Sequence, residues 1–235
     1  MRKIIFFGSS PFSVVALQRL VLSTKCQVLS VVTNEDKPVG RHLKMTPNPV
    51  KVFALEHNIP VFIDTEYRIP STDVIGIVAA YGKIIPQEVL DKFDGQMYNV
   101  HPSLLPKYRG ASPLQQQILD GVIDTGVTII KMDAKMDHGP IVAVAHDKIL
   151  PDDTAVTLGN RLFEKGAELV ISDQLSVISE QNHDEATYTK KLTRESGFIP
   201  WELRSNVQDL RTKQRAFSPW PGIWTIDPNG KRLKL

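Results

Sequence analysis

The fold is decided near the start of the chain, by the stretch RKIIFFGSSPFSVVALQRLVL (Arg2–Leu22). It opens with an apolar run that ends at Gly8, as a strand buried on both faces of a parallel sheet does. Ser10 and Pro11 then supply the residue types that favour a helix N-terminus. Apolar residues recur at helical spacing from Pro11 onward. The stretch therefore predicts a buried strand followed by a helix over Pro11–Leu22.

The same alternation continues through the first half of the chain. Further strands are expected over Val28–Thr33, Pro60–Ile63, Asp73–Ala80 and Met97–His101, helices over Pro49–His57 and Pro86–Phe93, and a polar loop over 34–48. Strands that alternate with helices build a sheet of mostly parallel strands. We therefore expect an α/β protein with a doubly wound, mostly parallel, Rossmann-like sheet.

The second half has a different pattern. The segments Gly126–Met132 and Pro140–Leu150 are rich in β-forming residues, and helices are expected over Asp153–Ser179 and Val207–Phe217. Between these helices, the residues 183–197 are polar and predict irregular structure. A Pro-Asn-Gly turn signal at 228–230 predicts a final hairpin from the strands 223–227 and 231–235.

Composition sets broad limits on the function. The 235 residues are 42% hydrophobic and 23% charged, as is typical of a globular protein, and the net charge of +2 gives no strong signal for nucleic acid. Cys26 is the single cysteine, which excludes an internal disulfide and a cysteine-cluster metal site. No apolar stretch approaches the ~20 residues of a membrane helix. We expect a cytoplasmic protein that does not enter a membrane.

Two short motifs carry the chemistry, NVHPSLLPKYRG (Asn99–Gly110) and DHGP (137–140). Asn99 and His101 are two residues apart on an expected strand, so their side chains point to the same face. Asp137, in the tight turn, can hold a carboxylate against the histidine. No serine or second cysteine occupies a nucleophile elbow, so the nucleophile should come from the substrate. An amine that attacks a carbonyl carbon is the simplest fit.

Each of these residues also has a plainer interpretation. A histidine at a strand end is often a structural hydrogen-bonding residue, and Asp137 alone is a typical turn former. The loop after Phe7 lacks the G-x-G-x-x-G pattern, which disfavours a dinucleotide site. The histidines show no metal-ligand spacing such as H-E-x-x-H, so no metal is expected.

Taken together, the motifs are similar to the signature of formyltransferases that use 10-formyltetrahydrofolate. The segments 111–113 and 125–129 fit the same pattern. Three further stretches, 36–51, Phe7–Phe12 and Arg215–Gly222, resemble the members of this family that act on methionyl-tRNA. The resemblance covers essentially the whole chain. It implies transfer of a formyl group from 10-formyltetrahydrofolate to the α-amine of initiator methionyl-tRNA, by a monomer without a metal.

The resemblance also implies roles for individual residues. The catalytic amide, imidazole and carboxylate would be Asn99, His101 and Asp137. The folate-binding residues would be Tyr81, Gly82, Ile84, Ser103, Leu104, Leu105 and Pro106. The residues that meet the acceptor end of the tRNA would be Phe12, Lys37, Arg41, Lys44 and Arg109. Two alternatives remain open: the same chemistry on an amino sugar nucleotide, and a non-catalytic folate- or RNA-binding derivative.

The chain departs from the family pattern at three places. His138 stands where the usual turn has threonine or alanine, and we expect it to face solvent. His42-Leu43-Lys44 follows the Gly-Arg pair where a glycine is usual. The resemblance implies a catalytic domain over 1–182, a linker and helix over 183–222, and over 223–235 only the opening strands of the family's C-terminal β domain.

Overall fold

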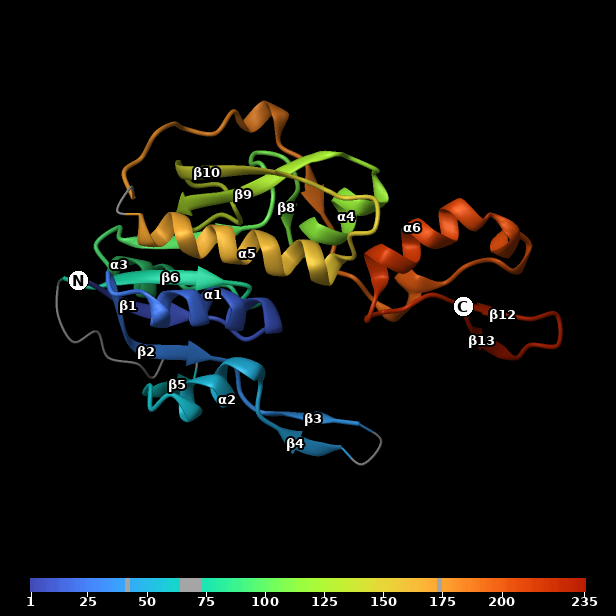
Figure 1. Cartoon of the computed structure of the whole chain (residues 1–235), viewed down its shortest axis with the longest axis horizontal. Helices are drawn as coiled ribbons and strands as arrows, with labels where there is room; N and C mark the ends of the chain where they lie inside the picture. Colours follow the sequence, from blue (N-terminus) through green and yellow to red (C-terminus); the bar gives the residue numbers. More distant parts are fainter. Residues whose placement is uncertain (41–42, 64–72, 173–174) are drawn as a thin grey trace.

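The computed structural model of the chain describes residues 1–40, 43–63, 73–172 and 175–235 (Figure 1). Its centre is one sheet, in which seven strands of the described chain lie side by side. In spatial order they are β10 (Ile141–Lys148), β9 (Asp124–Lys131), β7 (Met97–His101), β6 (Ile75–Ala79), β1 (Arg2–Phe7), β2 (Cys26–Thr33) and β5 (Val61–Ile63). The strands from β7 to β5 run parallel to one another. The strand β9 runs antiparallel to β7, and β10 runs antiparallel to β9. The expected doubly wound α/β class is confirmed.

Helices cover both faces of this sheet. One face carries the main core, to which four helices contribute: α1 (Pro11–Leu22), α2 (Pro49–Glu56), α4 (Pro113–Leu119) and α5 (Ala155–Ile171). The helix α3 (Gln87–Asp91) lies on the other face, over a second core. The strand β1 shows why two cores form, because Ile4 and Phe6 point into the first and Ile5 and Phe7 into the second. Each of these fully buried side chains contributes about 1.5–3 kcal/mol.

Side-chain caps fix the beginnings of the two long helices. The Ser10 hydroxyl accepts a hydrogen bond from the backbone N–H of Ser13 and Pro11 opens α1, as the sequence predicts. Thr154 caps α5 in the same way by accepting from the N–H of Thr157. Such caps stabilise a helix by about 1 kcal/mol each.

The helix expected over Asp153–Ser179 is shorter in the structure and ends at Ile171. Residues 173–174 lie outside the described chain. The apolar residues that follow continue the periodic pattern in the sequence, but they belong to a segment that is not helical. Leu175 packs on the main core, and Ile178 donates its backbone N–H to the carbonyl of Ile141 beside β10.

Several short elements were not predicted. The polar loop contains a hairpin of β3 (Lys37–Val39) and β4 (Lys44–Thr46), which projects from the body of the protein (Figure 1). Two-residue strands, β8 (Arg109–Gly110) and β11 (Tyr188–Thr189), pair in parallel. Three short 3₁₀ helices are η1 (His183–Glu185), η2 (Arg194–Gly197) and η3 (Trp201–Ser205).

The C-terminal part adds α6 (Val207–Phe217) and the predicted hairpin of β12 (Trp224–Ile226) and β13 (Arg232–Lys234). The range 183–222, expected as a linker and helix, places Ile199, Ala216 and Phe217 in the main core. None of the helices in the described ranges is both long and apolar enough to cross a bilayer.

Candidate active site

The strand order reverses between β1 and β6, where the crevice beyond the carboxyl ends of the strands is the usual place for a ligand. Hydrogen bonds tie the loops that meet there. The Ser9 hydroxyl donates to the carbonyl of Tyr81 over 2.7 Å. The Asn34 amide donates to the same carbonyl over 3.1 Å. The loops after β1, β2 and β6 therefore hold one another at the edge of the site.

The next strand along, β7, supplies the amide and the imidazole. Its alternation places Tyr98 and Val100 in the main core, so Asn99 and His101 face the opposite side of the sheet, as does Met97. Asn99 Nδ2 donates a hydrogen bond to Asp137 Oδ1 over 3.1 Å. The structure thus brings together the three side chains that the sequence singled out.

Both ring nitrogens of His101 face oxygen atoms of the protein. Nδ1 lies 3.5 Å from Asp137 Oδ1, and Nε2 lies 2.9 Å from the backbone carbonyl oxygen of Tyr108. Both neighbours are acceptors, so each ring nitrogen that carries a hydrogen can donate to one of them. The ring is only 3% exposed. His101 is therefore placed to hold Asp137, whereas Asn99 keeps a second amide hydrogen for a substrate oxygen.

The Asp137 carboxylate is fixed by two further features. Gly110 donates its backbone N–H to Oδ2 over 2.8 Å. The backbone of Asp137 is left-handed, with φ of 50°, a conformation that aspartate tolerates better than most residues. A Cβ atom on Gly139 would lie 1.8 Å from the carbonyl oxygen of Lys131, so this turn requires glycine there.

A glutamine that the sequence analysis missed also contacts this turn. Gln181 Nε2 donates to the carbonyl oxygens of Asp137 and Gly139, over 3.0 and 2.7 Å. Its Oε1 accepts from Arg109 Nη2 over 2.6 Å. The residue follows α5 in a polar segment, and no periodicity or motif marks it.

Arg109, expected at the acceptor end of a tRNA, has a different place in the structure. Its side chain is 1% exposed, and its guanidinium also donates to His183 Nδ1 over 2.8 Å and to the Tyr188 hydroxyl over 3.2 Å. These hydrogen bonds hold the Arg109 guanidinium inside the protein, and its contact with the acceptor end of a tRNA stays a prediction.

We expected His138 to face solvent, but the structure gives its side chain two contacts within the protein. Its side chain is 27% exposed, and its Nδ1 lies 2.7 Å from an Asp133 carboxylate oxygen. Its ring stacks on His183 with centroids 3.9 Å apart. Loss of water around the ring lowers the pKa of His183, and the positive charges of His138 and Arg109 lower it further.

The expected folate-binding residues come from the loops after β6 and β7. Tyr81 is buried with its ring edge-on to Phe7, whereas Gly82 is exposed and Ile84 is 81% exposed. Ser103 is fully buried and donates its hydroxyl to the carbonyl of Lys107. In the same loop Leu105 is buried, and Leu104 and Pro106 are half-buried. Binding of folate by these residues stays a prediction.

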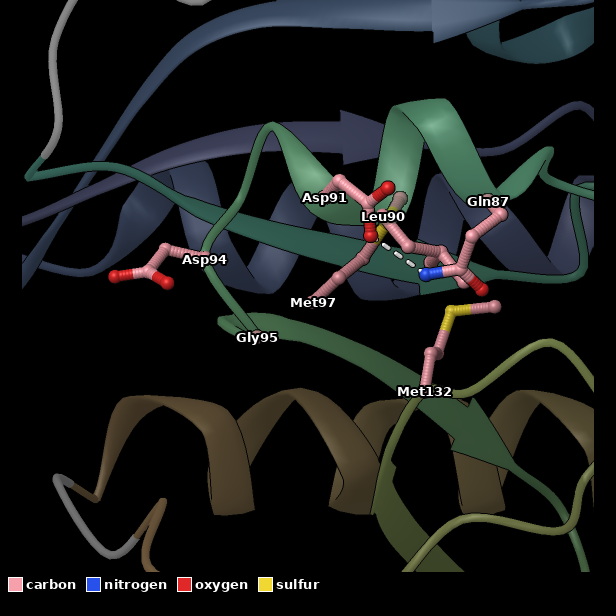
Figure 2. A pocket seen from close by; sticks show the side chains of 7 residues that line it. All are labelled: Gln87, Leu90, Asp91, Asp94, Gly95, Met97 and Met132. Carbon is pink, nitrogen blue, oxygen red and sulfur yellow. Dashed lines mark hydrogen bonds between the residues drawn. The ribbon is translucent and has the colours of Figure 1, made fainter.

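A hollow of about 220 Å³ opens on the α3 side of the sheet (Figure 2). Its lining is Gln87, Leu90, Asp91, Asp94, Gly95, Met97 and Met132. Leu90, Met97 and Met132 give it an apolar part. Met97 lies on the same face of β7 as Asn99, two residues before it. None of the expected folate-binding residues lines this hollow.

Of the remaining expected acceptor residues, Phe12 belongs to α1, and Lys37 and Lys44 belong to the hairpin β3–β4. Phe12 stacks on Phe163 of α5 with ring centroids 5.6 Å apart, and so supports the core. Lys37 and Lys44 are exposed on the hairpin β3–β4. Arg41 lies outside the described residues. Within the described ranges no three ligating side chains gather in a way that could hold a metal ion.

Comparisons with known proteins show the family to which the chain belongs. The family profile described as formyl transferase matches residues 2–173. The methionyl-tRNA formyltransferase of Hahella chejuensis is 39% identical over 248 residues, which cover 99% of this chain and 76% of that protein. The methionyl-tRNA formyltransferase of Thermus thermophilus is 37% identical over 243 residues, covering 99% and 78%.

Solved structures share the fold at lower identity. A 4-N formyltransferase from Francisella tularensis superposes with a TM-score of 0.74 and 15% identity, over 100% of this chain and 96% of that one. Glycinamide ribonucleotide transformylase 1 from Symbiobacterium toebii gives a TM-score of 0.59 and 19% identity, over 74% and 86% of the two chains.

Proposed function

Because the chain belongs to the formyl transferase family, we propose that it transfers the formyl group of 10-formyltetrahydrofolate to the α-amine of methionyl-tRNA. Identities of 37–39% to methionyl-tRNA formyltransferases, over nearly the whole chain, support this acceptor. The sugar N-formyltransferases that share the fold are only 16–22% identical, so they support the fold alone.

The meeting of Asn99, His101 and Asp137 carries the proposal. When the amine attacks the formyl carbon, the carbonyl oxygen gains negative charge. Asn99 can donate its second amide hydrogen to that oxygen. A donor held in place before the reaction costs no reorganisation when the charge develops, which is why such donors lower the barrier.

The same cluster handles the proton. The attacking amine becomes positively charged as its bond to the formyl carbon forms, and Asp137 accepts one of its protons, directly or through a water. The bond from the formyl carbon to N10 then breaks, and the proton passes to N10 of the departing tetrahydrofolate. His101 keeps the carboxylate in place throughout, because its ring nitrogen lies 3.5 Å from Oδ1.

The hollow beside α3 and the hairpin β3–β4 offer a contact surface to each of the two substrates. The apolar part of the hollow beside Met97 suits part of a folate ring system, and the hollow begins two residues from Asn99 on β7. Lys37 and Lys44 place two ammonium groups on an exposed hairpin, where RNA phosphates can reach them. Phosphate contacts of this kind make binding salt-dependent.

Release of tetrahydrofolate tests the proposal. The protein is incubated with 10-formyltetrahydrofolate and either charged initiator tRNA or a 4-amino sugar nucleotide, with the slowed variant Asp137→Ala as the control. We expect turnover with the tRNA and a KM for tRNA that rises steeply with salt. Turnover with the sugar nucleotide alone would overturn the acceptor, and turnover with neither would overturn the activity.

A further inference from the structure

Arg109 and Gln181 form a buried pair that the reaction itself does not use. Their side chains are 1% and 5% exposed, and they come from the loop after β7 and the segment after α5. Gln181 Oε1 accepts from Arg109 Nη2 over 2.6 Å and from Nε over 3.2 Å. We call these two residues the arginine–glutamine pair.

Arg109 determines which way the Gln181 amide points. A guanidinium has only donors, so the oxygen of the amide must face it. The NH₂ group then faces the carbonyls of Asp137 and Gly139. If the amide turned over, its oxygen would face two carbonyl oxygens and its NH₂ would face the guanidinium. One orientation is therefore strongly favoured.

The two carbonyls that Gln181 binds flank His138, so the amide holds both sides of the turn that carries Asp137. That turn needs such support, because Asp137 has a left-handed backbone, a conformation that costs a non-glycine residue free energy. The same turn aims the carboxylate at Asn99 and at the N–H of Gly110. A shift of the turn would move the carboxylate from both donors.

Arg109 is itself held mainly by neutral groups. Among the described residues its guanidinium has no ion pair with a carboxylate, and its other partners are His183 Nδ1 and the Tyr188 hydroxyl. A buried charge is costly unless hydrogen bonds compensate it. The pairing of β8 with β11 brings Tyr188 to Arg109, although the two are 79 residues apart in the chain.

We propose that Gln181, oriented by Arg109, is a positioning residue that holds Asp137 against Asn99 and His101. Gln181 acts through Asp137 alone and touches no substrate. The kinetic arm of the test rests on the proposed function, whereas the structural arm does not.

The structural arm measures hydrogen exchange at the amide of Gly110, which donates to Asp137 Oδ2. Gln181→Met removes the donor, and Gln181→Glu removes it while keeping an acceptor for Arg109. We expect exchange at Gly110 to accelerate at least tenfold in both variants. Arg161→Met, which breaks a network between α5 and β10, is the matched destabilised control and should leave Gly110 unchanged. Unchanged exchange in both glutamine variants would overturn the proposal.

The kinetic arm is a double-mutant cycle between Gln181 and Asp137. We expect Gln181→Met to lower kcat at least tenfold with both KM values within twofold, and to have little further effect when Asp137 is already alanine. Multiplicative losses in the double variant would show a role independent of Asp137 and would overturn the proposal. If the wild-type protein releases no tetrahydrofolate, the proposed function fails, and the exchange at Gly110 still decides this inference.

Discussion

Asn99 Nδ2 lies 3.1 Å from Asp137 Oδ1, although 38 residues separate them in the chain. The contact joins the middle residue of the parallel strand β7 to a turn that follows the antiparallel strand β9. It uses one hydrogen of the Asn99 amide and leaves the other for a substrate. This one hydrogen bond therefore holds the Asp137 carboxylate in place and also orients the Asn99 amide, whose second hydrogen the proposed chemistry uses.

Replacement of Asn99 by alanine tests that donor. We expect Asn99→Ala to lower kcat by ~100-fold or more, since loss of one oxyanion donor costs about 3 kcal/mol of barrier, with small changes in KM. Circular dichroism should show an intact fold. Gln116→Ala, which alters an exposed amide on α4, is the control and should keep full activity. Full activity in Asn99→Ala would refute the role.

Gly139→Ala tests the tight turn beside Asp137. The new Cβ would lie 1.8 Å from the Lys131 carbonyl oxygen, so the backbone must move. We expect a lower melting temperature and a fall in kcat of at least tenfold. Gly121→Ala is the comparison, because its Cβ meets nothing within 4 Å and only its φ of 67° is unfavourable. It should cost about 1 kcal/mol of stability and leave kcat unchanged.

The lowered pKa of His183 predicts a pH-dependent contribution to stability. The folded protein favours the neutral ring, so this contribution is complete above the ordinary pKa of histidine and is lost as pH falls through the lower, folded value. His183→Gln keeps an acceptor for Arg109 but cannot titrate. Its stability relative to wild type should therefore improve between pH 8 and pH 5, as measured by urea unfolding. A difference between wild type and His183→Gln that stays constant with pH would contradict the prediction.

A second pH dependence should arise at Arg161. Burial alone would raise the pKa of Asp153, but hydrogen bonds from Arg161, the Leu150 N–H and Thr157 outweigh it, so the pKa is lowered. The resulting stability is present above the ordinary aspartate value and is lost as pH falls through the folded value. We expect Arg161→Met to cost about 2 kcal/mol at pH 7. Urea unfolding at pH 3 should show a much smaller loss, and an equal loss would contradict this account.

Much of the fold could be predicted because local signals agreed with one another. The bounds of α1, α6 and β7 match the expected ranges to the residue. In α1 a capping serine, a first-turn proline and periodic apolar residues all point to one helix. In the range 153–179 an apolar pattern alone was available, and it could not distinguish the helix from the segment that pairs beside β10.

The site could be predicted only in part. The shared face of Asn99 and His101 follows from strand geometry, and the resemblance supplied Asp137. The surroundings of Arg109 depend on pairing between strands of two residues, 79 positions apart at Tyr188 and Arg109, and Gln181 contacts Arg109 from outside both strands. Strands so short carry no periodicity, and an arginine is expected at the surface unless a partner is known.

The pairing of β8 with β11 also determines how much chain the reaction needs. The family profile ends at residue 173, whereas Gln181 and the strand Tyr188–Thr189 lie beyond it. A fragment cut at that boundary would retain Asn99, His101 and Asp137 but would lose Gln181 and the strand that pairs with β8. We therefore expect catalysis to need the chain at least as far as Thr189.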